Sequence, residues 1–332
     1  MASTAEMPAN RLVHLPHFAI PLGIAGLGGA WTAGVLLLNA PEWVDDTLYS
    51  VAAVLWLVFS AVYIGERARH RGAFRSDRES AASGAGAAFL PVVGILLIVH
   101  FGRYMPLAAA RTVCWVLVAA LAVVAAQLLA HWLTGQLTFQ QLHPGYTLPL
   151  VAGPFIAAIG LASVQAVSAA RAALGVGMFF WVVIGGVITA RLITGGPLPE
   201  RVLPSLSVLL APPAAGGIAT FVAYPGPVGP LQLAFFGVFV VMALVQIALL
   251  KAYLCLPFSL GFWNFTFPVC ASANYSLRWL GEAEFDGQDG LAWGILGLAT
   301  LFVLSIAAAT VRGPIAAAGR RLSRVRIREG RR

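Results

Sequence analysis

The residues with the most chemical content lie in an apolar segment at 257–279, where two asparagines share a helical face with a phenylalanine. Positions spaced alternately by four and three fall on one side of a helix, and this stripe is Leu260, Asn264, Phe267, Ala271 and Asn274. An asparagine side chain costs free energy in hydrocarbon unless it finds a hydrogen bond. We therefore predict that Asn264, Ala271 and Asn274 line a cavity, with Phe267 between them.

A second stripe of the same segment is wholly apolar, and it consists of Phe262, Phe265, Val269 and Ala273. We expect this stripe to pack against other helices. From the two stripes alone, Phe267 is explained equally well as ordinary helix packing or as a side chain that closes the cavity.

The chain shows no constellation typical of an enzyme or a metal site. It contains no GxSxG, HExxH or Walker glycine loop, and its three cysteines lack metal-ligand spacing. We expect no catalysis, no metal and no cofactor. The interiors of the apolar segments contain no Asp or Glu, and His100 and His131, both near segment ends, are the only interior candidates for proton coupling. The sequence therefore predicts an uncharged pore that selects by width and hydration cost.

The low content of charged residues indicates that the protein is surrounded by lipid. Of 332 residues, 59% are hydrophobic and 10% charged, with a mean hydropathy of +0.85, whereas soluble domains carry about 25% charged residues. Apolar runs of roughly 18–25 residues span a bilayer as helices. We predict ten such spans: 16–39, 44–65, 85–102, 107–134, 147–168, 172–194, 203–223, 229–255, 257–279 and 289–311.

Proline separates the ten spans into two classes. Only the odd-numbered spans carry it in their interiors, at Pro21, Pro91, Pro154, Pro212 and Pro268. A proline inside a helix removes a backbone hydrogen bond and kinks the chain, and the freed carbonyl must be satisfied away from lipid. We therefore predict an all-α membrane protein in which five helical hairpins form a ring, with kinked helices around a central pore and straight helices outside.

The basic residues predict the orientation of the chain. The net charge is +8, which nucleic-acid binding would also explain, but the positive-inside rule accounts for it better. With ten spans, 17 basic residues fall on the side of the termini and 4 on the other. We predict a multi-pass inner-membrane protein with both termini cytoplasmic, a pore domain over residues 1–311, a basic tail over 312–332, and no nucleic-acid partner.

Four stretches carry a family resemblance. They are HFAIPLGIAGLG at 17–28, HPGYTLPLVA at 143–152, VLLAPP at 208–213 and PFSLGFWNFTFPV at 257–269. Together they resemble the tellurite-resistance/dicarboxylate transporter family, which includes bacterial tellurite-resistance proteins and the plant guard-cell slow anion channels. The resemblance covers all ten spans, and the motif at 257–269 is its most specific part.

The resemblance implies a function and a gate. In that family a phenylalanine of the ninth span plugs the pore, and the matching residue is Phe267. The small pore-facing residue of the first span matches Ala19, whose methyl group departs from the family's frequent glycine and would narrow the pore. The family also implies small anions as substrates, contact with membrane lipid and a homotrimer. We predict a gated anion channel; the alternative is a carrier of dicarboxylate, sulfite or tellurite, with or without coupling to protons.

Overall fold

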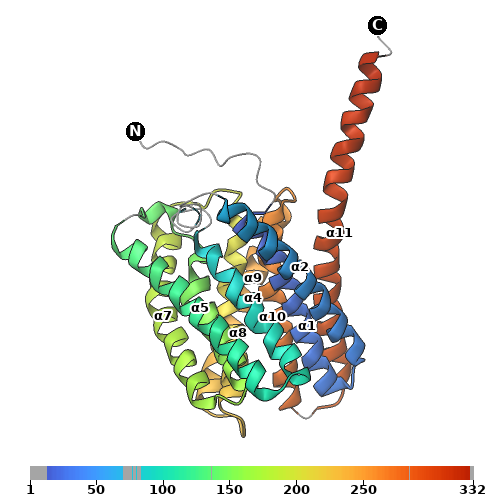
Figure 1. The fold of residues 1–332 in the computed structure, drawn as a ribbon. Coiled ribbons are helices and arrows are strands. Elements are labelled where there is room, and N and C mark those ends of the chain that lie inside the picture. Colours follow the sequence, from blue (N-terminus) through green and yellow to red (C-terminus); the bar gives the residue numbers. More distant parts are fainter. Residues whose placement is uncertain are drawn as a thin grey trace.

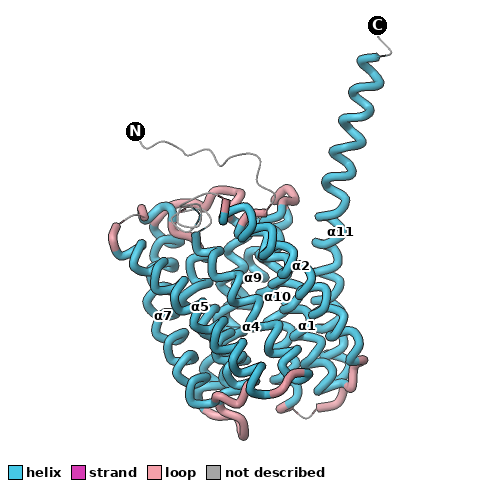
Figure 2. Tube along the Cα trace, in the orientation of Figure 1, coloured by secondary structure: helices cyan, strands magenta, loops and turns pink. Residues whose placement is uncertain are grey.

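The computed structural model describes residues 13–69, 77, 80, 84–135, 137–283 and 285–329, with side chains described as far as residue 312. Within these residues the regular structure is helical, and Figure 2 shows helices joined by short loops. The helices pair as consecutive hairpins: α1 (Ala19–Leu38) with α2 (Glu42–Ala68), α4 (Phe89–Phe101) with α5 (Leu107–Leu133), α6 (Gly153–Ser163) with α7 (Val167–Thr194), α8 (Ala211–Ala223) with α9 (Pro230–Leu254), and α10 (Thr266–Gly281) with α11 (Gln288–Glu329).

Nine helical stretches of the described residues are long and apolar enough to cross a membrane. The tenth span, α10, has 16 residues and is preceded by the short helix Leu260–Phe265. The prediction of an all-α polytopic membrane protein is confirmed. Figure 1 shows α11 continuing well beyond the other helices on one side of the bundle, because this helix runs on without a break into the predicted tail.

Each α-helix of the odd-numbered spans follows a short helical segment of different pitch. The leading segments are the 3₁₀-helices Leu15–Phe18, Gly84–Ala88, Leu203–Leu210 and Leu260–Phe265, and the π-helix Leu148–Ala152. The five predicted prolines all lie at the second or third residue of the α-helix that follows. A proline is tolerated in the first turn because its missing N–H has no partner there to lose. The prolines therefore mark a change of helix type at the start of each α-helix rather than a bend in its middle.

Burial separates the two classes of span. In the most apolar stretches of the first, third, fifth and seventh spans, between 56% and 78% of residues are buried, against 11–22% in the even-numbered spans. Helix α1 contacts α4 and α10, α6 contacts α4 and α8, and α8 also contacts α10. These contacts run in a closed cycle, and the even-numbered helices expose apolar faces, as expected where lipid is the solvent.

Part of the basic pattern lies outside the described residues. Three arginines of the predicted basic loop, Arg71, Arg75 and Arg78, belong to this part, as do the side chains of the tail beyond residue 312. The orientation of the termini stays a prediction.

Candidate anion pathway

Two cavities lie among the odd-numbered spans, and each is lined by all five of them. Cavity 1, of about 130 Å³, lies where the inner α-helices begin, and one residue from each span lines it at Ala19, Phe89, Leu148, Ala211 and Asn264. Cavity 2, of about 110 Å³, lies farther along the same helices and is lined by Gly26, Leu96, Ile156, Ala215 and Ala271. Phe267 is the single residue common to both linings, and its side chain is buried.

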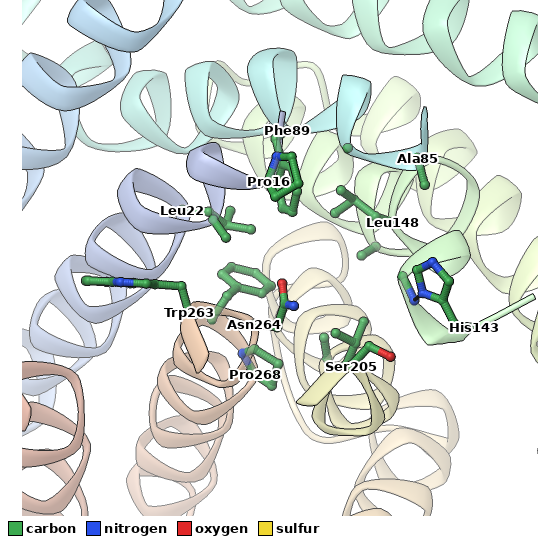
Figure 3. Close-up of a pocket in the computed structure, with 17 residues that line it drawn as sticks. Pro16, Leu22, Ala85, Phe89, His143, Leu148, Ser205, Trp263, Asn264 and Pro268 are labelled. Atoms are coloured by element: carbon green, nitrogen blue, oxygen red, sulfur yellow. Dashed lines mark hydrogen bonds between the residues drawn. The ribbon is translucent and has the colours of Figure 1, made fainter. Parts of the chain in front are cut away.

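Cavity 1 is predominantly apolar. Figure 3 shows the Asn264 amide directed toward the space that Leu22, Phe89 and Leu148 enclose. Ser205 also lines the cavity, and its buried Oγ has no hydrogen-bond partner within the described part of the chain. No residue of this lining is Asp, Glu, Lys or Arg. The predicted absence of fixed charge therefore holds for the lining of cavity 1.

His143 contributes the titratable side chain of cavity 1. Burial, reinforced by the positive charge of Arg191, lowers the pKa of His143 to about 4. Its Nδ1 accepts a hydrogen bond from the Gly145 N–H at 3.2 Å, which requires an unprotonated nitrogen. His143 is therefore neutral at pH 7.

Cavity 2 carries charge, which corrects the prediction of a wholly uncharged pore. Arg103 and Arg278 both line it. Arg278 donates through Nε to Asn274 Oδ1 at 2.9 Å, and Asn274 donates through Nδ2 to the Gly29 carbonyl at 2.7 Å. Arg103 pairs with Asp46 at 2.7 Å. The sequence prediction missed both arginines because it used them only to orient the chain: Arg103 follows the predicted span 85–102 directly, and Arg278 lies at the end of the predicted span 257–279.

An acidic pair lies beside cavity 2, inside a helix that was predicted to start two residues later. Because α2 begins at Glu42, Asp45 is buried in its first turns and accepts a hydrogen bond from Thr32 Oγ1 at 2.9 Å. His100 lies 3.8 Å from Asp45 and 2.9 Å from Asp46. The expectation concerned the interiors of the spans, and this acidic pair lies at the very start of α2, where it adds charge beside cavity 2.

The structure brings the predicted cavity-facing residues together. Ala19 and Asn264 line cavity 1, Ala271 and Asn274 line cavity 2, and Phe267 lies between the two. Of the five prolines, Pro268 lines cavity 1; Pro21, Pro91 and Pro212 are buried and Pro154 is half-buried.

The neighbouring stripe behaves differently. Phe265 packs edge-on against Tyr253 of α9 and Phe302 of α11, with ring centroids 4.8 Å and 6.5 Å away, and it lines neither cavity. Leu260, the first residue of the asparagine stripe, is exposed and also lines neither cavity.

Of two site residues that the prediction left out, the sequence pattern could have found Arg278 but not Gly26. Arg278 is the next step of the asparagine stripe, four residues after Asn274, and it lines cavity 2 as the pattern requires. Gly26 lies against the Phe267 ring, since a Cβ built on Gly26 would be 3.0 Å from Phe267 Cδ2. The sequence shows a glycine-rich first span, but it does not say which glycine meets the ring.

Comparison with known proteins identifies the family. A family model described as the voltage-dependent anion channel, SLAC1, matches residues 13–311. The chain belongs to this family. The chain is 24% identical over 297 residues to the tellurite resistance protein TehA homolog of Haemophilus influenzae, covering 87% of this chain and 90% of that protein. It is 22% identical over 307 residues to the S-type anion channel SLAH2 of Arabidopsis thaliana, covering 90% of this chain and 58% of that protein.

Membership of the SLAC1 family fixes the general class of activity. The match includes all ten helical spans and both cavities. The chain is a multi-pass membrane protein of an anion channel and transporter class, which is not an enzymatic one. The family resemblance expected from the sequence motifs is confirmed.

Proposed function

We propose that this protein is a gated anion channel, in which small anions pass from cavity 1 to cavity 2 and Phe267 closes the path between them. The observation that carries the proposal is the position of Phe267 in the linings of both cavities. A benzyl side chain in a narrow apolar passage excludes hydrated ions by its volume and by dewetting the space around it. The printed name of the plant relative, S-type anion channel SLAH2, supports the same class of activity.

Cavity 1 favours passage over tight binding in this proposal. Its lining carries no fixed charge, so an anion entering it meets no cation that would hold it deeply. The five inner α-helices follow their 3₁₀ or π segments near this cavity, and backbone dipoles that line a pore can interact with an ion there. We infer that anions are attracted there by weak backbone dipoles, and that selection depends on width and on the cost of removing water.

The alternative function is a proton-coupled carrier, and one observation favours it. Asp45 is buried beside His100, and the His100 ring stacks on Tyr49 with centroids 4.1 Å apart. Ionisable groups within the membrane often serve as proton sites. Flux of chloride, nitrate, sulfite and malate into liposomes, measured with and without a pH gradient, distinguishes the two functions. Uphill anion uptake driven by the gradient alone would favour the carrier.

The gate is tested by two chemically identical substitutions. Phe267→Ala should raise anion conductance strongly, because it removes the side chain between the two cavities. Phe265→Ala should instead lower the free energy of unfolding by about 3–5 kcal/mol, the usual cost of truncating a buried phenylalanine, and leave conductance per folded channel nearly unchanged. If Phe267→Ala conducts no better than wild type, or if Phe265→Ala opens the channel equally, the proposed gate is wrong.

A further inference from the structure

Arg278 is hydrogen-bonded to a side-chain amide, unlike the other arginines at this end of the bundle. Arg103, which also lines cavity 2, pairs with Asp46. Arg111 and Arg171 donate to the backbone carbonyls of Val164 and Ala223. Arg278 forms no ion pair within the described part of the chain. Its Nε donates a hydrogen bond to the uncharged amide of Asn274. Its two terminal nitrogens are therefore not committed to a protein carboxylate.

The Arg278 guanidinium is held in place through a chain of two hydrogen bonds. Asn274 accepts from Arg278 Nε at 2.9 Å and donates to the Gly29 carbonyl on α1 at 2.7 Å. Gly29 permits this contact, because a Cβ on it would lie 3.2 Å from Asn274 Nδ2 and 3.3 Å from the Tyr49 hydroxyl. These two hydrogen bonds fix the direction of Nε. The Arg278 side chain therefore loses less conformational entropy when it binds a ligand.

Two acidic residues lie beside cavity 2, and within the described part of the chain neither forms an ion pair with Arg278. Asp46 already accepts from Arg103, Tyr104 and His100 at 2.7–2.9 Å. Asp45 accepts from Thr32 Oγ1 and does not line the cavity. A half-buried cation that faces a small cavity with its terminal N–H donors not bound to a carboxylate attracts an anion from solution, and it does so more strongly than in bulk water because the local dielectric is lower.

We propose that Arg278, oriented by Asn274, forms an anion-recognition site in cavity 2 for small oxyanions. A guanidinium presents parallel N–H donors that match two oxygens of one anion. A spherical halide cannot engage both donors with the same geometry. The inference rests on the proposed function for its place on a conduction path, but the binding itself is measurable without conduction.

The test measures ligand binding by stabilisation of the purified full-length protein in detergent. The thermal midpoint is followed as sodium nitrate or sodium chloride is added, with ionic strength held constant by the sodium salt of a bulky sulfonate buffer. A ligand that binds the folded state raises the midpoint along a saturating curve. For wild type we expect saturable stabilisation by nitrate at lower concentrations than by chloride.

Three variants decide the assignment. Arg278→Gln should weaken the apparent nitrate affinity by about tenfold or more, the usual effect of losing a hydrogen bond to a charged group. Arg278→Lys keeps the charge and loses the paired donors, so it should reduce the preference for nitrate over chloride while still binding both. Arg111→Gln removes a positive charge from the same side of the bundle and should leave the nitrate curve unchanged.

Several results would overturn the site. They are the absence of saturable binding to wild type, an unchanged nitrate curve in Arg278→Gln, or an equal loss in Arg111→Gln. If Arg278→Gln does not fold, an Arg278→Lys protein with undiminished nitrate preference contradicts the proposal instead. If Phe267→Ala does not raise conductance, the proposed gate is wrong, but these binding curves are unaffected. The two proposals can therefore be contradicted independently.

Discussion

Gly26 of α1 supports the face of Phe267: a methyl group on Gly26 would come within 3.0 Å of Phe267 Cδ2 and 3.3 Å of Cys270 Cβ. At these distances the ring must shift by a few tenths of an ångström, and Cys270 on the same helix is fully buried. The Phe267 ring itself lines both cavities. The lack of a side chain at Gly26 therefore determines how close the Phe267 ring can pack against α1.

Gly26→Ala should consequently lower anion conductance severalfold, because the added methyl group shifts the Phe267 ring and enters the lining of cavity 2. The added methyl group should also cost about 1–3 kcal/mol of stability through overpacking. Single-channel or liposome flux measurements on Gly26→Ala give the first quantity, and denaturation gives the second.

A matched pair of variants separates these effects. Gly65→Ala on α2 adds the same methyl group where nothing lies within 4 Å, so it should leave conductance unchanged. In the Gly26→Ala/Phe267→Ala double variant, conductance should return to the level of Phe267→Ala. A double variant as poorly conducting as Gly26→Ala alone would show that the glycine does not act through the ring.

His143 should make stability fall as the pH falls. Burial and the charge of Arg191 lower the pKa of His143 to about 4 in the folded protein, while the unfolded chain has a pKa near 6.5. The unfolded state therefore binds more protons between these values. The contribution of neutral His143 to the free energy of unfolding is fully present above pH 6.5. It declines as the pH falls toward 4, by up to about 3 kcal/mol.

The His143 prediction is tested with an isosteric variant. His143→Asn retains an acceptor for the Gly145 N–H but does not titrate. Thermal midpoints measured from pH 7.5 to pH 4.5 should fall more steeply in wild type than in His143→Asn. Parallel curves for the two proteins would exclude His143 as the source of the pH dependence.

The basic pattern predicts that both termini lie in the cytoplasm. Of the basic residues, 17 fall on the side of the termini and 4 on the other. A reporter fused after Arg332 and one inserted near Phe74, which lies outside the described residues, should both give cytoplasmic signals. A periplasmic signal from either position would contradict ten spans in this orientation.

The family resemblance predicts a homotrimer in which each protomer has its own path. Both cavities are lined by residues of a single chain, so no partner is needed to complete them. Native mass spectrometry in mild detergent should give the mass of three chains. A monomeric mass under conditions that preserve activity would exclude the trimer.

Much of the fold was predictable from the sequence because lipid imposes simple rules. Apolar length predicts the spans, and proline in alternate spans predicts which helices are buried. The same pattern misplaced the prolines by a few residues. Proline excludes an ordinary α-helical hydrogen bond wherever it stands, so its presence does not distinguish a mid-helix kink from the first turn after a 3₁₀-helix.

The site was predictable on one helix and much less so between helices. The spacing of Asn264, Phe267, Ala271 and Asn274 identified their common face, because helical periodicity is a local property. The contact of Gly26 with Phe267 joins two spans far apart in the sequence, and no local pattern specifies it. Asp45 was missed for a related reason: its burial depends on Thr32 of the preceding helix, not on its own neighbours.

The polar stripe of α10 has a consequence for how the protein is made. Among the described residues, nine other spans are long and apolar enough to enter a bilayer by their own composition, whereas α10, with 16 residues, is not among them; its asparagines and Arg278 also raise the cost of leaving water. Strongly apolar helices, α9 and α11, flank it in the chain. During biosynthesis α10 therefore depends on its neighbours for insertion, and the helix that carries Phe267 is among the last to take its place. A nascent chain interrupted before this step would lack one of the five walls of each cavity.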